Sequence, residues 1–577
     1  MRQFCWLVAA LVLCAANCRA QRIEVTIPAL RKPVTGHLIL VFAKTDKPEP
    51  RMQMNEDYQS AQGFGVDVSE LKPGAPIVVN AKTFGYPRRS LADLDAGDYY
   101  VQAVFNVYEL FQLGDGRNLW LPPDKGEGQH WYSKPGNPYN RPVKLHFDPK
   151  AQATIRIALD QVIAPIAGTD RDPEVLAQRE PGAHWLQYMR FKSAALSKFW
   201  GRDTYLGAWI LLPGGFDEHP GAHYPLVVYQ DHFYPGFRPY PWVTSPPAAD
   251  ASPREKDGYR FFQDWTSGRL PRVILIYVQS ANPYYDDSYD VDSANVGPYG
   301  MAINDELIPA IEKKYRGIGQ GWARATFGGS TGGWEALATQ IFYPTRYNGT
   351  YAACPDPVDF HAYQNIDLYN DTNAFTRQGD FGQVPIAADR KADGSIIANT
   401  GPEYAYEYVL GTHGRSTEQW DIWQAVFSPV GPDGYPAQVI DPLTGAIDSK
   451  VVALLVPALR FDRDDDARLG DAGAGVGGQG ASGGGRRRYV FPEQRSAHAR
   501  GAVGADAASA LRCDLPVRPA HAALLHRRPG GLHHGTEQCR LAAAGAAADG
   551  GAYAGNGAAG RRYYFVALLS CLALRRR

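Results

Sequence analysis

Gly328-Gly329-Ser330-Thr331-Gly332 is a G-x-S-x-G stretch, and it decides the expected fold of this chain. An apolar run over residues 322–327 precedes it, and an amphipathic stretch that begins at Trp334 follows it. A serine can sit on a sharp strand-to-helix turn only where the flanking positions carry almost no side chain, which Gly328 and Gly332 provide. The pattern therefore predicts a nucleophile elbow with Ser330 at its apex. Because the motif is short, a glycine-rich turn before an ordinary helix is the alternative.

The residues around this turn predict strands that alternate with helices. Four short, nearly continuous apolar runs have strand length: 205–212, 224–230, 272–278 and 322–327. Between the last two runs, Ile303, Leu307 and Ile311 recur on one face of a predicted helix. Strands buried on both faces that alternate with amphipathic helices indicate an α/β domain with a mostly parallel sheet, doubly covered by helices. In such a sheet Ser330 lies beyond the carboxyl end of a central strand, where ligands bind.

The N-terminal part predicts a separate all-β, sandwich-like domain over residues 22–165. Strand-length runs rich in Val, Ile and aromatic residues are separated by Pro, Gly and Asp clusters, and no helix-length pattern interrupts them. Residues 166–184, with several Pro and Asp, indicate a linker to the α/β domain at 185–451. Aromatic residues of the β domain either stack on sugars or pack against the neighbouring domain. The clearest of them are Trp120, Trp131 and Tyr132.

Charge and the N-terminus bound the partners and the location. The 577 residues carry a formal net charge of -1, and no basic stripe occurs in the first 450 residues, so we expect no nucleic-acid binding. Residues 1–20 have a basic start, an apolar stretch and a small residue at the end, which is typical of a cleaved secretory signal peptide. The apolar stretch is shorter than the roughly 20 residues that span a bilayer. We therefore expect a secreted or periplasmic protein without a membrane span.

Serine chemistry needs a base that takes the hydroxyl proton and N–H donors that stabilise the oxyanion. Ser330 is the expected nucleophile, and the backbone N–H of Thr331 is the expected first oxyanion donor. The second donor is expected from the loop after an earlier strand, which here contains His232. His232 is not expected to be the base, because in this fold the base follows the serine along the chain. A purely structural His232 remains an alternative.

Two regions after the strands need separate interpretation. Asp356 and Asp359 follow the strand predicted after the elbow, and either can be the triad acid; Asp356 is the candidate catalytic acid. Residues 360–450 are rich in aromatic residues and fit a lid insertion over an apolar or sugar-like substrate, although packing alone also explains them.

An acidic loop follows the run 272–278. Its oxygen-bearing residues can hold calcium, but the spacing of an EF-hand is absent, so a solvated loop is the preferred interpretation. We expect no metal or other cofactor. The residues of this loop are Asp286, Asp287, Asp290, Asp292 and Asn295.

With these elements in place, the chain resembles the α/β-hydrolase superfamily, and more closely its exported esterases of the esterase D and feruloyl-esterase type. The resemblance rests on four stretches: Tyr224-Pro225-Leu226-Val227-Val228, residues 306–312, Tyr315-Arg316, and 328–334. It implies a Ser-Asp-His hydrolase that acts on esters without a cofactor, with Ser330 as nucleophile and Thr331 as oxyanion donor. It supplies neither the acid nor the histidine.

Residues 452–577 shift abruptly to Ala, Gly, Arg and isolated Asp, as in an aberrant low-complexity tail. A disordered tail is one interpretation. Our hypothesis is instead a frameshifted translation of the hydrolase C-terminus, because the codons for residues 488–495, read one nucleotide later, permit Asp-Thr-Phe-Phe-Leu-Asn-Asn. In that case the chain as given lacks the acid, the histidine and part of the sheet, and we expect weak or absent activity. Sequencing the gene across the codons for 445–460 tests this hypothesis, and an intact frame would contradict it.

The sequence therefore predicts a serine hydrolase that cleaves carboxylic esters through an acyl-enzyme on Ser330. The expected partner is a small-molecule or polysaccharide-linked ester substrate. A serine peptidase of the prolyl-oligopeptidase kind is one alternative, because it shares the fold and the elbow. A carbohydrate-binding or cell-surface protein with a catalytically dead hydrolase fold is the other.

Overall fold

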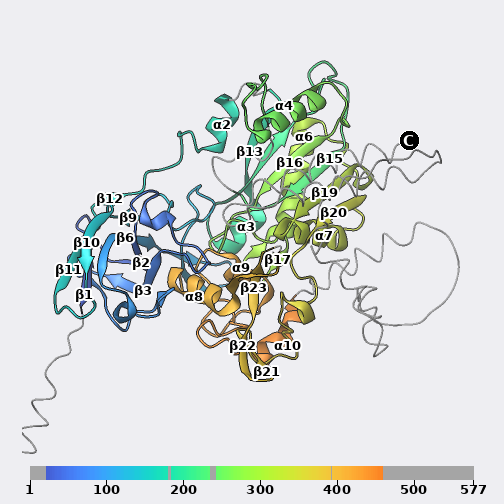
Figure 1. The fold of residues 1–577 in the computed structure, drawn as a ribbon. Coiled ribbons are helices and arrows are strands. Elements are labelled where there is room, and N and C mark those ends of the chain that lie inside the picture. Colours follow the sequence, from blue (N-terminus) through green and yellow to red (C-terminus); the bar gives the residue numbers. More distant parts are fainter. Residues whose placement is uncertain (1–20, 180–183, 234–241, 392, 459–577) are drawn as a thin grey trace, which may run out of the picture.

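The computed structural model describes residues 21–179, 184–233, 242–391 and 393–458 (Figure 1). The predicted signal peptide and nearly all of the predicted frameshifted tail lie outside these residues. The described part contains an all-β unit, drawn in blue, and an α/β unit, drawn in green to yellow (Figure 1). A later segment of the chain, drawn in orange, packs against both units. In the part of the chain that is described, no helix combines the length and the apolarity needed to cross a bilayer.

The all-β unit contains two sheets packed face to face and a separate two-stranded ribbon of β7 and β8. The smaller sheet has the order β11-β1-β4, and the larger one has the order β12-β9-β6-β2-β3-β5, with β10 paired to β6. The predicted sandwich-like domain is confirmed. The strands are β1 (Arg22–Thr26), β2 (Val34–Ala43), β3 (Gln62–Leu71), β4 (Ile77–Val79), β5 (Gly85–Tyr86), β6 (Gly97–Val107), β7 (Glu109–Gln112), β8 (Asn118–Leu121), β9 (Pro138–Tyr139), β10 (Val143–Phe147), β11 (Thr154–Ala158) and β12 (Gln161–Val162).

Strand β2 is buried on both faces, because its side chains alternate between two cores. Leu38, Leu40 and Phe42 pack in the core shared with the smaller sheet. Ile39 and Val41 point the other way and pack against helix α8 (Thr400–Leu410). The sandwich is therefore attached to the rest of the molecule through the outer face of its larger sheet.

The α/β unit is built on one six-stranded sheet with the order β13-β14-β16-β15-β19-β20. Strands β16, β15, β19 and β20 are parallel to one another, whereas β14 runs antiparallel to both of its neighbours, β13 and β16. Within the described residues β20 is paired on one side only. The strands are β13 (Leu186–Ser193), β14 (Thr204–Leu211), β15 (Leu226–Gln230), β16 (Ile274–Gln279), β19 (Arg324–Gly329) and β20 (Gly349–Ala353).

Helices cover both faces of this sheet. Val228 and Ile276 share a core with α3 (Ala194–Trp200), α6 (Ile308–Tyr315) and α7 (Thr331–Phe342). Val227 and Leu275, their neighbours along the strands, pack instead against α4 (Pro253–Thr266). This two-sided burial confirms the predicted mostly parallel, doubly covered sheet of an α/β hydrolase. Smaller elements of this unit are α2 (Pro173–Arg179), which lies within the predicted linker, β17 (Asp292–Ser293), β18 (Gly297–Pro298), α5 (Tyr299–Met301) and the π-helical turn Ala302–Leu307 that leads into α6.

The segment predicted as an aromatic-rich insertion connects the two units. Helix α8 places Tyr406, Val409 and Leu410 against the larger β sheet, where they also meet Trp131. Helix α9 places Ile422 and Trp423 in the core of the α/β unit. Trp131 thus packs against the neighbouring segment, whereas the side chain of Trp120 is 37% exposed. The elements are β21 (Thr376–Gly379), β22 (Gly382–Pro385), β23 (Ala387–Arg390), β24 (Ile396–Asn399), α8, α9 (Gln419–Phe427) and α10 (Ser449–Ala458).

Candidate active site

Ser330 forms the whole turn between β19 and α7. Its backbone has φ +56° and ψ −125°, a combination that costs energy for a residue with a side chain. The turn is tight because a Cβ atom on Gly328 would lie 2.1 Å from the carbonyl oxygen of Gly332, and one on Gly332 would lie 2.0 Å from that of Gln230. The side chain of Ser330 is exposed at the carboxyl edge of the sheet. The geometry is that of a nucleophile elbow.

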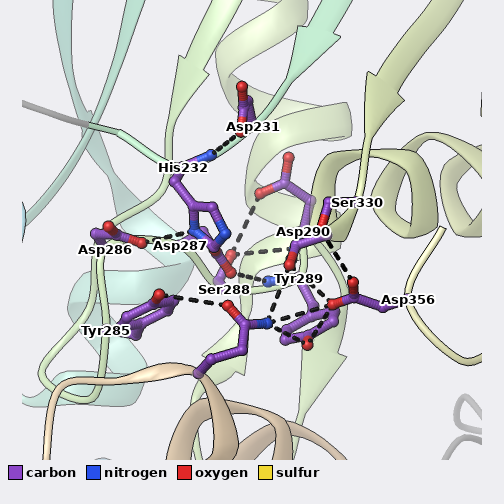
Figure 2. Close-up of polar contacts among 12 residues, drawn as sticks. Asp231, His232, Tyr285, Asp286, Asp287, Ser288, Tyr289, Asp290, Ser330 and Asp356 are labelled. Atoms are coloured by element: carbon purple, nitrogen blue, oxygen red, sulfur yellow. Dashed lines mark hydrogen bonds and ion pairs between the residues drawn. The ribbon is translucent and has the colours of Figure 1, made fainter. Parts of the chain in front are cut away.

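Asp356 is the acidic group that contacts Ser330. The Ser330 hydroxyl donates a hydrogen bond to Asp356 Oδ1 at 3.4 Å. The other carboxylate oxygen accepts from Thr331 Oγ1 at 2.8 Å. It also accepts from the Tyr289 hydroxyl at 2.9 Å (Figure 2). Gln419 Nε2, at the start of α9, completes this network 3.3 Å from Asp356 Oδ2. Burial raises the pKa of Asp356, although the hydrogen bonds from Thr331 and Tyr289 oppose that shift.

Asp359 does not share this network in the described structure. Its side chain accepts the backbone N–H of His361 at 3.0 Å and so caps the short turn over residues 360–362. Of the two acids that follow β20, only Asp356 therefore faces the serine. A triad acid, however, holds a histidine rather than the nucleophile itself, so the role of Asp356 as catalytic acid remains a prediction.

The two predicted oxyanion residues, Thr331 and His232, differ in whether the backbone N–H already has an acceptor. Thr331 is the first residue of α7, and the N–H groups of a first helical turn have no acceptor within the helix. The N–H of His232 instead donates to Asp231 Oδ1 at 2.9 Å, and its carbonyl oxygen accepts from the Tyr277 hydroxyl. The N–H of His232 is therefore committed in this conformation. Residues 234–241, the continuation of the same loop, lie outside the described residues.

The imidazole of His232 points into the acidic loop that follows β16. Its Nδ1 atom lies 2.9 Å from Asp286 Oδ1 and also contacts Asp287 (Figure 2). Burial by itself lowers the pKa of His232, but the charges of Asp287 and Asp286 raise it well above its usual value. His232 is thus held as a cation between two carboxylates, with a side chain that is only 12% exposed.

The expectation of a solvated acidic loop is wrong for its first half. Asp286 and Asp287 are each 1% exposed and Asp290 is 3% exposed, because His232 and Gln230 turn toward them. Burial raises the pKa of Asp290 to about 6. The second half has a structural role: Asp292 Oδ1 accepts the N–H of Met301, and Asn295 Nδ2 donates to the carbonyl oxygens of Ala425 and Ser428.

The all-β unit contributes a residue to the same region. His130, in the loop between β8 and β9, places its Nε2 atom 3.8 Å from Asp286 Oδ2. Burial and the nearby charge of His232 lower the pKa of His130 to about 4, so it is neutral at pH 7. Sequence patterns gave no sign of His130, Tyr289 or Gln419, because each reaches the site through long-range packing. In the sequence, only their polar side chains suggested that these residues could take part in a functional site.

Part of the chain, mainly the α/β unit, matches a known protein family. The family model described as "Putative esterase" matches residues 203–427, which include the elbow, the acidic loop and α9. This match confirms the esterase resemblance inferred from the sequence. No protein with a curated description matches the chain.

Three of the solved structures that match part of the chain are esterases or hydrolases by their titles. A ferulic acid esterase is 22% identical, and the match covers 30% of this chain and 59% of that one, with a TM-score of 0.23. The S-formylglutathione hydrolase from Agrobacterium tumefaciens is 15% identical over 31% of this chain and 60% of that one, with a TM-score of 0.22. A CE1 ferulic acid esterase from Anaeromyces mucronatus is 13% identical over 44% of this chain and 93% of that one, with a TM-score of 0.21. The chain thus spans about three fifths of the length of the first two proteins. The fold assignment rests on the sheet order and the family match.

Proposed function

We propose that this protein is an exported serine hydrolase that cleaves carboxylic esters through an acyl-enzyme on Ser330, because residues 203–427 match the family model described as "Putative esterase". The observation that carries the proposal is the exposed Ser330 on a strained turn at the carboxyl edge of the sheet. The substrate is a small-molecule or polysaccharide-linked ester, and the location is extracellular or periplasmic, as the predicted signal peptide indicates.

The chemistry follows from the groups around Ser330. The Ser330 oxygen attacks the ester carbonyl carbon while its proton passes to a base, and the carbonyl oxygen becomes an oxyanion. The N–H of Thr331, at the positive end of α7, stabilises that oxyanion. Collapse expels the alcohol, which takes up the proton, and leaves the acyl group on Ser330. A water molecule, activated by the same base, then releases the acid.

The base is the missing partner. Within the described residues the hydrogen-bond partner of the Ser330 hydroxyl is Asp356, and no histidine bonds it. We propose that a histidine encoded after β20 supplies this role once the reading frame beyond about residue 452 is restored. The unpaired edge of β20 supports this proposal, since further strands would extend the sheet there. Loss of a triad base costs about a million-fold in turnover, so the chain as given is expected to be nearly inactive.

A fluorophosphonate probe tests the nucleophile. The gene is sequenced across the codons for 445–460, and the chain as given is compared with the frame-corrected chain. We expect rapid labelling of the corrected chain, none in its Ser330→Ala variant, and unchanged labelling in Ser395→Ala, which removes a serine from a remote hairpin. A corrected chain that folds but stays unlabelled would favour the non-catalytic alternative. Robust turnover by the chain as given would refute the frameshift.

Substrate class needs a second assay. Small chromogenic esters and proline-containing peptides are offered to the corrected chain under the same conditions. Ester cleavage that disappears in Ser330→Ala supports the esterase. Peptide cleavage with little ester cleavage would instead support the peptidase of the prolyl-oligopeptidase kind.

A further inference from the structure

We propose that His232, Asp286 and Asp287 bind a divalent transition-metal ion, with Zn²⁺ and Mn²⁺ as the ions to test, next to the nucleophile elbow. One ligand atom from each of these residues lies within 4.8 Å of the other two. One imidazole nitrogen and carboxylate oxygens are donors that such ions accept. Calcium is a poorer fit, because its sites are built from oxygen alone. The metal proposal does not rest on the proposed esterase activity.

The fold places these ligands together from separate strands. Gln230 on β15 is the register partner of Gly328 on β19, so His232 and Ser330 each stand two residues beyond a paired position. Asp286 and Asp287 come from the loop after β16, which is the other neighbour of β15. Figure 2 shows the imidazole of His232 directed at this loop. The carboxyl ends of three neighbouring strands thus meet at one place.

An oxygen atom without a hydrogen bond points to a ligand here. Asp286 is 1% exposed, and its Oδ2 atom makes no hydrogen bond within the described residues. A buried carboxylate oxygen without a donor is costly, and a bound cation removes that cost. The Nε2 atom of His130 lies 3.8 Å from this oxygen. An ion bonded at about 2.1 Å to each of two atoms fits between them up to about 4.2 Å, so His130 is placed to be a fourth ligand.

A second buried carboxyl oxygen without a hydrogen bond also favours a cation. Glu335 on α7 is 2% exposed, and its Oε1 atom likewise makes no hydrogen bond within the described residues. Burial, followed by the charges of Asp290 and Asp287, raises the pKa of this carboxyl group well above its usual value. A divalent ion would neutralise carboxylates that His232 alone does not balance. It would also fasten the His130 loop of the all-β unit to the α/β unit.

Metal binding by the folded full chain decides the proposal. The purified protein is stripped with a chelator, its fold is verified by circular dichroism, and ZnCl₂ and MnCl₂ are titrated by calorimetry with metal content measured after dialysis. We expect one ion per chain and a higher melting temperature with the ion than without it. A folded native chain that binds neither ion would overturn the proposal and leave His232 as a cation paired with two carboxylates.

Variants locate the ion. Asp286→Asn and Asp287→Asn should each weaken binding at least tenfold, and His130→Asn should weaken it less. His413→Asn is the matched control, because His413 Nδ1 lies 3.0 Å from the single carboxylate of Asp433 at an exposed site. The His413→Asn variant should bind the metal ion with the same affinity as the native chain. One-to-one binding that survives both aspartate variants unchanged would place the ion elsewhere and refute this site.

Discussion

The Ser330 hydroxyl donates to Asp356 Oδ1 at 3.4 Å, and the backbone N–H of Asp356 donates back to the carbonyl oxygen of Ser330 at 3.3 Å. The elbow and the loop after β20 are therefore joined by both backbone and side chain. Ser330 N–H adds a third link, to the carbonyl oxygen of Ala353 at 3.0 Å. The strained turn is held from the neighbouring strand as well as by its own glycines, which is how a costly backbone conformation persists.

Asp356→Asn should slow fluorophosphonate labelling of the frame-corrected chain about 10- to 100-fold. The amide keeps the shape but loses the charge that orients the hydroxyl, and hydrogen bonds to charged groups contribute about 1.5–3 kcal/mol. Labelling rates measured under pseudo-first-order conditions check this. Asp359→Asn is the control, since Asp359 caps a separate turn. Equal slowing in both variants would mean that the effect comes from the loop as a whole.

Gly332→Ala should prevent the elbow from forming. The new Cβ atom would lie 2.0 Å from the carbonyl oxygen of Gln230, which belongs to a central strand and cannot move away. Gly329→Ala is the matched control, because its Cβ atom would meet no atom closer than 3.8 Å. We expect Gly332→Ala to lower the free energy of unfolding by more than about 3 kcal/mol and Gly329→Ala by less than about 1 kcal/mol. Urea denaturation measures both, and similar losses would argue against this turn geometry.

The free energy of unfolding should fall as pH rises from about 5 to 8, and Glu403 should contribute to the fall. Burial raises the pKa of Glu403 to about 8, whereas in the unfolded chain it is near 4.5. Between these values the folded state binds the extra proton, so stability decreases with pH by up to about 1.4 kcal/mol per unit. Trp420 Nε1 donates to this carboxyl group at 2.9 Å.

Glu403→Gln should therefore flatten the pH dependence measured by urea denaturation at pH 5 and pH 7.5. The slope should not vanish, because burial also raises the pKa of Glu418 to about 8. Glu218→Gln, at an exposed position, is the control and should leave the slope unchanged. A Glu403→Gln slope identical to that of the native chain would show that Glu403 is not held protonated.

Leu410→Ala should destabilise the protein by about 2–5 kcal/mol, because Leu410 is fully buried between α8 and the larger β sheet. Leu443→Ala is the comparison, since that side chain is 37% exposed, and it should cost less than about 1 kcal/mol. Denaturation followed by two probes also reports whether the all-β unit unfolds with the rest. A small effect of Leu410→Ala would indicate that α8 does not hold the two units together.

The sequence by itself determined the elbow and the class of the sheet around it. The elbow can be recognised from Gly328 and Gly332 because the turn excludes a Cβ atom at both positions. This constraint acts over only five residues. The runs 224–230 and 272–278 can be recognised as buried strands because strands covered on both faces need apolar residues throughout. Such local constraints act on residues that are adjacent in the sequence. They can therefore be recognised without knowing which distant residues contact them in the fold.

Only the tertiary structure decided what surrounds Ser330. Asp286 and Asp287 were expected in solvent because charged residues are rarely buried without a partner, and their partner His232 lies on another loop. Gln419 reaches Asp356 from α9, and His130 reaches Asp286 from the all-β unit. These pairings depend on how sheets and helices pack over long sequence separations. A single sequence does not encode such distances as a pattern, so the chemistry beside the elbow could be found only in the folded chain.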